Sequence, residues 1–344
     1  MEVMTREIPC QLCVTHSALV TRVFEAAMSQ RCIPTEKTRS LSRRSAPVCG
    51  IGLSVDDLSD EMEDCFKSYD RKGFQALLNR LDHTLSELTE GRPFEAYIPH
   101  ANKILYQEII FRPNCVGYSY LEEGFTSMAW STQRNARTSW AKILRSSIRS
   151  WRVGSHYRFS RPMFDHTLPG YQAAYAISDS AFKNMPGRQD VVAYLPPLPT
   201  GDGLAGHTYI ILDALYLFQG IHWEDYENAL VKALLSQELP DGEMLIKFHF
   251  ADAGSAEKYQ SLCQKLVGRG TPPLRLLGAS YAVEQNLTAR DLVLFSYTAL
   301  GYYAALSGVR VYCFAGDIKD LSIPSFIESK LPADFWPVVA SAKS

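Results

Sequence analysis

The chain has 344 residues, of which 46% are hydrophobic. A common domain has about 150 residues, so this length predicts two domains with separate cores. The 35 Lys and Arg residues nearly balance the 37 Asp and Glu residues, for a formal net charge of -2. This balance provides no basic field for nucleic acid, so we expect no nucleic-acid partner and only local charge-driven binding.

The beginning of the chain and the cysteines indicate where the protein acts. The first residues include Glu2 and Glu7 and lack the basic and apolar regions of a secretory signal. No apolar run approaches the roughly 18 residues of a membrane span. Cys10 and Cys13 form one C-x-x-C pair, but no second pair or His cluster has zinc spacing. We therefore expect a cytoplasmic protein with reduced thiols, no metal and no cofactor.

Strand and helix signals alternate through the first half of the chain. The expected elements are, in order, a strand at 11–14, a polar turn at 15–17, a helix at 18–28, a mobile polar loop at 31–47, a helical pattern at 62–91, a strand at 94–100, a helix at 102–110, a strand at 116–122 and a basic, partly helical segment at 138–161. Such alternation is typical of a parallel, doubly wound sheet.

The second half repeats this alternation. Its expected elements are strands at 175–178, 191–199 and 208–216, a helix at 223–239, a strand at 244–250, a helix at 256–267, strands at 274–280 and 291–296, a helix at 299–308 and a strand at 309–316. Two such halves predict an α/β protein with two Rossmann-like domains facing a central cleft. We expect a first domain at 1–160, a second at 161–330 and a segment at 331–344 that packs back on the first domain.

Two adjacent acids, Glu122 and Glu123, precede Gly124 just past the predicted strand at 116–122. Ligands of doubly wound folds bind at the carboxyl ends of the strands. A carboxylate there can take the proton from an attacking hydroxyl, while its neighbour orients it. Two solvated glutamates in a turn are the alternative.

Lys247 and His249 lie two residues apart, on one face of the predicted strand at 244–250 and near its end. Cations at this place suit a leaving phosphate, and His249 can also donate a proton. A lysine on an edge strand and a hydrogen-bonded structural histidine explain the same residues.

Ser296, Tyr297 and Thr298 open the predicted helix at 299–308. Hydroxyls and free N–H groups at a helix start favour an anion such as phosphate, although ordinary capping needs only one hydroxyl. Glu284, in the preceding loop, is a candidate acceptor for ribose hydroxyls or an ordinary surface residue. We also assign Thr15 and His16, in the first polar turn, to donor binding. The chain has no P-loop, no G-x-S-x-G motif and no G-x-G-x-x-G motif after its first strand, which argues against common NTPases, dehydrogenases and α/β-hydrolases.

In their order and spacing, these motifs resemble those of bacterial sialyltransferases of GT-B fold, in particular the capsular polysialyltransferase-like group. That group has an acidic-acidic-Gly motif, a later His-Pro motif and a Ser/Thr pair that opens a helix. The corresponding stretches here are Glu122-Glu123-Gly124, Lys247-Phe248-His249-Phe250 and Ser296-Tyr297-Thr298. The segments AYIPHANKILYQEII, YAISDSAF and TALGYYAALSG are also similar, and the resemblance spans about residues 8 to 316.

The resemblance implies a metal-independent, inverting transfer of sialic acid from CMP-sialic acid to a hydroxyl of a lipooligosaccharide or capsule glycan. It places the general base on one of the two acids, and we choose Glu123. It implies that His249 binds or protonates the departing phosphate, and that Ser296 and Thr298 hold phosphate oxygens.

Two departures leave alternatives open. Phe250 stands where the family has proline, and Tyr297 stands where the family often has its first serine. The alternatives are a GT-B transferase that uses another donor, such as CMP-Kdo or another nucleotide sugar, and a catalytically silent GT-B protein that binds glycans or an assembly partner.

A basic patch of Arg145, Arg149, Arg152 and Arg161 is either a solvated helix face or a contact with anionic glycan or the cytoplasmic face of the inner membrane.

Overall fold

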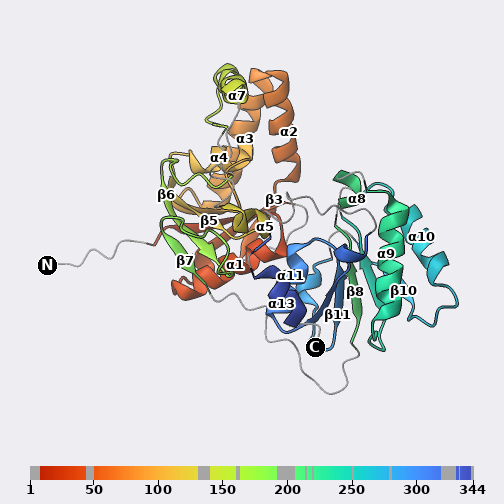
Figure 1. Ribbon diagram of the computed structural model, residues 1–344. Coiled ribbons are helices and arrows are strands. Elements are labelled where there is room, and N and C mark those ends of the chain that lie inside the picture. Colours follow the sequence, from red (N-terminus) through yellow and green to blue (C-terminus); the bar gives the residue numbers. More distant parts are fainter. Residues whose placement is uncertain are drawn as a thin grey trace. The chain divides into compact units, whose positions relative to one another are not determined.

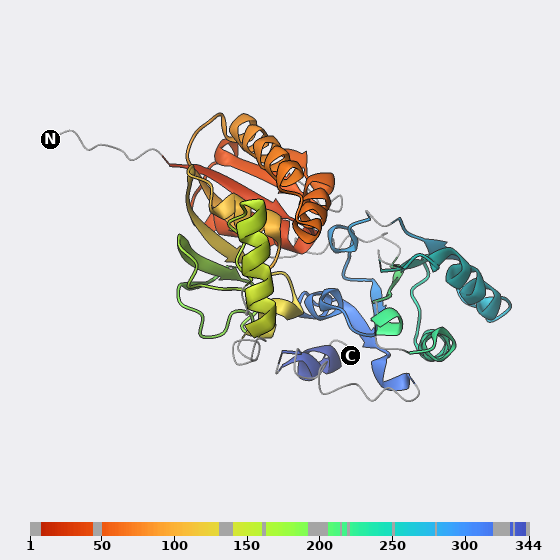
Figure 2. The ribbon, with the colours of Figure 1, turned by 90° about the horizontal axis from the view of Figure 1, so that it is seen from above.

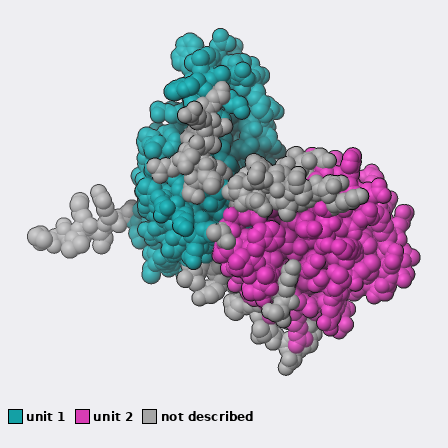
Figure 3. Space-filling view, viewed as in Figure 1, with its two compact units in different colours: residues 1–193 teal, residues 194–344 magenta. Residues whose placement is uncertain are grey.

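The computed structural model divides into two compact units, Met1–Ala193 and Tyr194–Ser344, each of which is described by itself (Figure 3). The described residues are 8–43, 50–130, 140–159, 163–191, 206–213, 215–218, 221–249, 252–278, 281–318, 331–332 and 334–341. The predicted strand at 191–199 lies almost wholly outside these residues, as do Cys49, Arg161 and Phe250.

Unit 1 contains a parallel sheet with helices on both faces (Figure 1). Its strands are β1 (Cys10–Thr15), β2 (Thr38–Ser42), β3 (Ile51–Ser54), β4 (Phe94–Ile98), β5 (Cys115–Leu121), β6 (Tyr171–Ala176) and β7 (Arg188–Asp190). Its helices are α1 (Ala18–Gln30), α2 (Asp56–Ser68), α3 (Arg71–Thr89), α4 (Ile104–Ile110), α5 (Phe125–Met128) and α7 (Trp140–Val153), with a short 3-10 turn, η1 (Thr35–Lys37). The strand order is β3-β2-β1-β4-β5-β6-β7.

Unit 2 contains a second parallel sheet, of order β10-β9-β8-β11-β12. Its strands are β8 (Thr208–Ile211), β9 (Met244–Lys247), β10 (Leu274–Leu276), β11 (Leu292–Phe295) and β12 (Arg310–Cys313). Its helices are α8 (Leu215–Phe218), α9 (Trp223–Ser236), α10 (Ser255–Leu266), α11 (Ala299–Leu306) and α13 (Phe335–Ser341), with 3-10 turns η2 (Val283–Gln285) and η3 (Ala315–Asp317). Two parallel sheets in sequence confirm the predicted α/β class with the two Rossmann-like domains of a GT-B fold.

The position of the domain boundary differs from the prediction. Strands β6 and β7 complete the first sheet, because β6 pairs with β5 and β7 pairs with β6. The first unit therefore extends to Ala193 rather than to residue 160. The C-terminal helix α13 packs against α11 and β12 of unit 2, where the Phe335 ring stacks on Tyr302 at 5.9 Å between centroids.

The predicted loop at 31–47 is wrong over residues 38–42, which form β2 between β1 and β3. Hydrophobic patterning misses this strand because its sequence, TRSLS, contains one apolar residue. Arg39 is buried there because its guanidinium donates to the Leu88 carbonyl at 2.9 Å and reaches the Glu90 carboxylate at 3.2 Å. Burial of β2 thus depends on hydrogen bonds to a distant helix end.

The helical pattern at 62–91 corresponds to two helices. Helix α2 ends at Tyr69, which has a left-handed backbone (φ 63°), and α3 begins immediately afterwards. Asp70 caps α3 by accepting a hydrogen bond from the Gly73 N–H at 2.9 Å. The sequence pattern does not reveal this break, because each of the two helices buries an apolar stripe and the helical spacing of apolar residues therefore resumes directly after Asp70.

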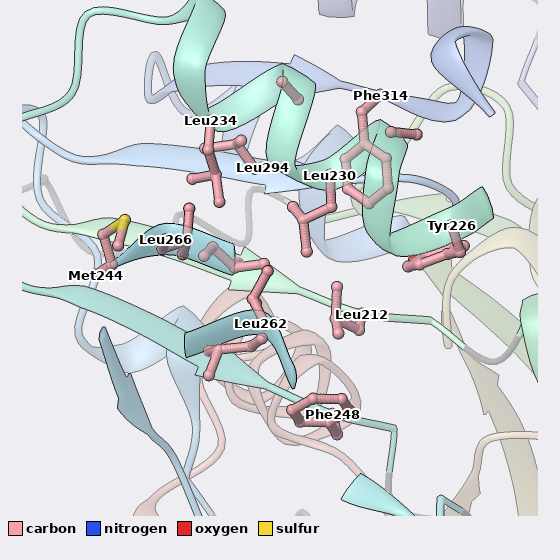
Figure 4. Packing of buried hydrophobic residues seen from close by; sticks show 14 of the residues in the cluster. Leu212, Tyr226, Leu230, Leu234, Met244, Phe248, Leu262, Leu266, Leu294 and Phe314 are labelled. Atoms are coloured by element: carbon pink, nitrogen blue, oxygen red, sulfur yellow. The ribbon is translucent and has the colours of Figure 1, made fainter. Parts of the chain in front are cut away.

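The core of unit 2 lies between one face of its sheet and helices α9 and α10, with α11 and α13 on the other face (Figures 1 and 2). Figure 4 shows Leu230 and Leu234 of α9 pointing toward Leu294 of β11 and Leu262 of α10. Within the described residues, no helix is both long and apolar enough to cross a membrane.

Truncation of this core tests its contribution to stability. Leu230 is fully buried, so Leu230→Ala should lower the free energy of unfolding of unit 2 by about 2–5 kcal/mol through lost contacts and a cavity. Leu235 lies on the same helix but is 45% exposed, so Leu235→Ala should change it by no more than about 0.5 kcal/mol. Denaturant unfolding measures both, and equal losses would contradict this placement of the core.

Candidate active site

Three side chains meet at the carboxyl ends of neighbouring strands in unit 1. His16 follows β1, His100 follows β4 and Glu123 follows β5, and these strands are adjacent in the order β1-β4-β5. The Glu123 carboxylate lies 3.6 Å from His16 Nε2 and 3.9 Å from His100 Nε2. The side chain of Glu123 is only 6% exposed. A carboxylate shielded from water between two imidazoles is a candidate proton acceptor.

The orientation of the His100 ring is fixed by the backbone. The Asn102 N–H donates to His100 Nδ1 at 3.1 Å, so Nδ1 acts as the acceptor nitrogen. A neutral His100 therefore carries its proton on Nε2, the nitrogen that faces Glu123. This tautomer places an N–H group rather than a lone pair on the ring nitrogen nearest Glu123.

Glu122 has a different environment from Glu123. Its side chain is fully buried and accepts the Ile177 N–H at 2.7 Å and the Ser178 N–H at 3.0 Å. Its own N–H donates to the Tyr175 carbonyl at 3.0 Å. Glu122 therefore joins the end of β5 to the segment that follows β6, and it supports the site rather than facing a ligand.

Gly124 completes the motif for a conformational reason. Its backbone has φ 109° and ψ -147°, a region that residues with a Cβ rarely occupy. The chain turns here into α5, and the Glu123 N–H is held by Ser127 Oγ at 2.9 Å. A glycine thus lets the chain turn away directly after the candidate base.

Thr15 and His16 differ in what they can contribute. The Thr15 hydroxyl is buried and bonds to the Ser17 carbonyl and to Thr21 Oγ1, both at 2.9 Å. It therefore fixes the turn between β1 and α1. Both residues lie in unit 1, where His16 contacts the candidate base Glu123.

Lys247 and Glu284 are brought together in unit 2. Burial lowers the pKa of Lys247 below its ordinary value, and the charge of Glu284 partly opposes this effect. The Lys247 ammonium donates to the Tyr281 carbonyl. The intervening Phe248 is buried in the core, whereas Lys247 and His249 on either side of it are only half buried. This is the alternation expected for an extended backbone.

The backbone of His249 is held by a buried charged cluster. The His249 carbonyl accepts the Asp252 N–H at 2.9 Å. The Asp252 carboxylate accepts hydrogen bonds from Lys258 at 2.6 Å, Tyr216 at 2.5 Å and the Gly254 N–H at 3.0 Å. Burial raises the pKa of Asp252, but the bonds from Lys258 and Tyr216 outweigh it and hold this pKa below its ordinary value. The loop that carries His249 is thus anchored by an ionised carboxylate.

The Asp213 carboxylate is hydrogen-bonded to the residues that lead into α11. Asp213 follows β8 and accepts hydrogen bonds from the Ser296 hydroxyl and the Tyr297 N–H. Because Ser296 donates its one hydroxyl proton to Asp213, the Tyr226 hydroxyl, at 2.5 Å, donates to Ser296. Ser296 therefore supports the helix start.

Thr298 and Tyr297 complete this helix start. Thr298 is the N-cap of α11 and accepts the Leu300 N–H at 3.3 Å. Burial, and then the nearby charge of Asp213, raise the pKa of the Tyr297 phenol above its ordinary value, so its hydroxyl stays protonated at neutral pH. The predicted hydroxyls therefore differ in role: Ser296 is engaged by buried groups, and Thr298 caps the helix.

Among the residues of these clusters that the sequence analysis did not identify are His100 and Asp213. Each is a polar residue that follows a buried parallel strand by one or two positions. The same signal marks Glu123, so it was available for all three. Within the described residues, no group of three or more His, Cys, Asp or Glu side chains is arranged to hold a metal ion.

Comparisons with known proteins find similarity of fold alone. No family model and no curated protein matches the chain. Among solved structures, a putative UDP-N-acetylglucosamine 2-epimerase from Listeria monocytogenes is 10% identical over 98% of this chain and 90% of its own, with a TM-score of 0.48. The UDP-GlcNAc 2-epimerase from Methanocaldococcus jannaschii is 9% identical over 97% and 93%, with a TM-score of 0.46. The ADP-heptose heptosyltransferase II from E. coli is 11% identical over 88% and 83%, with a TM-score of 0.40.

The free energies of unfolding of two alanine variants can distinguish the environments of Glu122 and Glu123. Glu122→Ala leaves the buried N–H groups of Ile177 and Ser178 without their acceptor, so it should lower the free energy of unfolding by about 2 kcal/mol or more. Glu123→Ala should cost clearly less, because its carboxylate meets the two imidazoles at longer distances. Denaturant unfolding of both variants measures this, and the reverse order would contradict the structural role of Glu122.

Proposed function

We propose that this protein is an inverting glycosyltransferase that moves sialic acid from CMP-sialic acid to a hydroxyl of a glycan acceptor. The observation that carries the proposal is the nearly buried Glu123 carboxylate at the end of β5, beside His16 and His100. An alcohol is a weak nucleophile at neutral pH, and a carboxylate placed at the attacking oxygen removes its proton as the new bond forms. The family resemblance of Glu122-Glu123-Gly124 supports the same role.

The proposed reaction is a single displacement. The acceptor oxygen forms a bond to the anomeric carbon while the bond from that carbon to the CMP phosphate oxygen breaks. The hydroxyl proton passes to Glu123, and the electron pair of the broken bond leaves with CMP. His100 acts as a positioning residue, since its Nε2 carries a proton and lies 3.9 Å from the Glu123 carboxylate.

We assign the departing phosphate to unit 2. Lys247 supplies an ammonium group and His249 an imidazole at the end of β9, and Thr298 lies just beyond the end of β11, at the N-cap of α11. Strand β8 separates β9 from β11, so these ends lie roughly 10 Å apart, a span suited to a nucleotide. Stabilisation of the phosphate charge as the sugar departs lowers the barrier, because this charge develops in the transition state.

Asp213 and Ser296 have a supporting role in this proposal. Asp213 accepts the Tyr297 N–H just before the N-cap of α11, and Thr298 caps the Leu300 N–H, so a phosphate would be held by side-chain cations more than by the helix start. Glu284 remains the candidate acceptor for ribose hydroxyls, close to Lys247.

Replacement of the base tests the reaction. Glu123→Gln should reduce transfer by about 10²–10⁴-fold, because the amide cannot accept the hydroxyl proton. Binding of CMP should change little, since the donor phosphate is assigned to other residues. Initial rates with CMP-sialic acid measure transfer, and the thermal shift in the presence of CMP measures binding. Glu87→Gln, at an exposed position of α3, is the matched control.

Turnover of the Glu123→Gln variant at the wild-type rate would exclude Glu123 as the base. Stabilisation of the wild-type protein by UDP-N-acetylglucosamine or GDP-sugars, without an effect of CMP compounds, would contradict the donor. A folded protein that neither responds to these ligands nor releases CMP would contradict a transferase function altogether.

The depressed pKa of Lys247 predicts how CMP binding depends on pH. Because burial lowers this pKa from 10.5, the ammonium loses its proton at a lower pH than an exposed lysine does. We expect the affinity for CMP to fall as the pH rises through this lowered pKa, since the neutral amine no longer attracts phosphate. Lys247→Arg keeps its charge and should flatten the decline. Calorimetric titration at neutral to alkaline pH measures it, and an unchanged decline in the variant would exclude Lys247 as its cause.

A further inference from the structure

Helix α7 turns its large apolar side chains away from unit 1. It contacts α2 and α3 (Figure 1). Its buried residues are the small or branched Ser146, Ser150 and Val153. Trp140 and Trp151 are instead 82% and 80% exposed. A helix on the surface of a soluble protein normally buries its apolar stripe. The outer face of α7 is therefore apolar, the reverse of this usual arrangement.

The exposed apolar residues form one continuous stripe. Trp140, Leu144, Ile148 and Trp151 are all exposed and follow one another at spacings of four, four and three residues. At 3.6 residues per turn they fall within about 80° of one another, over a length of roughly 16 Å. The stripe lies opposite Ser146 and Ser150, so packing on α2 and α3 leaves it uncovered.

One flank of the stripe is basic. Lys142, Arg145, Arg149 and Arg152 fall on the same side of the helix, between the apolar stripe and the buried face. The guanidinium groups of Arg149 and Arg152 lie 5.5 Å and 5.2 Å from the centre of the Tyr69 ring. This contact holds part of the basic flank in a fixed direction. The whole chain has a formal net charge of -2, so the positive flank is a local feature.

We propose that α7 docks unit 1 onto an anionic lipid membrane, with the helix axis along the membrane surface. Tryptophan favours the membrane–water interface, and basic side chains reach anionic headgroups beside an apolar strip. A bilayer offers both an apolar layer and negative charge along the whole length of α7. A folded protein would need a groove for two tryptophans with carboxylates along one side only. The charge and the exposed tryptophans therefore favour the lipid surface.

Vesicle binding of the full chain tests this proposal without any nucleotide or glycan, so its outcome is independent of the proposed transfer. We expect the wild-type protein to sediment with phosphatidylcholine vesicles that contain phosphatidylglycerol, and less with phosphatidylcholine alone. Added salt should weaken the binding, because the headgroup attraction is screened. Brominated lipids should quench tryptophan fluorescence.

Paired variants separate the apolar and charged contributions. The double variant Trp140→Ala, Trp151→Ala should bind such vesicles about tenfold more weakly, because it loses the largest inserted side chains. Trp336→Ala, which changes the half-exposed tryptophan of α13, should bind as the wild type does. Arg145→Glu should also weaken binding about tenfold. Arg269→Glu, an exposed arginine of unit 2, is its matched charge control.

Three results would overturn the proposal. The first is no binding of the wild-type protein to vesicles of either composition. The second is equal binding by the α7 variants and their controls, with folding of each variant confirmed by circular dichroism. The third is a dimer by light scattering that the double tryptophan variant converts to monomers while vesicles remain unbound, which would assign the stripe to a protein interface.

Discussion

Parallel pairing between strands that are not consecutive is the constraint on which both units depend. Strand β1 pairs with β4, and β8 pairs with β11, although two other strands separate the members of each pair in the sequence. At each of these pairs the strand order reverses, so the loops after the two strands lead to opposite halves of the sheet. The carboxyl ends of the two strands therefore stay accessible between these loops. His16 and His100 follow one such pair, and Asp213 and Ser296 follow the other.

Adjacent acids acquire different functions because a strand end sends successive side chains in different directions. The Glu122 carboxylate accepts hydrogen bonds from two backbone N–H groups, which fix the end of β5 against the segment after β6. Glu123 lies on the side of β4 and β1, where imidazoles surround it. Glu122 thus holds the candidate base Glu123 in place, and the unusual backbone of Gly124 lets the chain turn away directly after it.

In unit 2, buried polar groups hold the loops that bear the candidate donor residues. The Asp252 cluster anchors the loop after β9, and Asp213 with Tyr226 and Ser296 anchors the start of α11. Each carboxylate is satisfied by several donors, which offsets the cost of its burial. Lys247 differs because burial lowers its pKa and so disfavours its charged form. An anionic ligand beside the ammonium would stabilise that charged form. Rigid surroundings therefore favour a defined phosphate position.

The class of the fold and the position of the two acids follow from the amino-acid sequence alone, because alternating strand and helix patterns and the short strand that leads into the acids are local signals. The sequence did not reveal β2, whose burial comes from hydrogen bonds of Arg39 to a helix end far along the chain. It also did not reveal the continuation of the first sheet through β6 and β7, or His100 as the neighbour of Glu123. These features, together with the buried position of Glu122 and the position of Glu123 beside two imidazoles, are tertiary, because strand order and side-chain burial depend on pairing between distant segments.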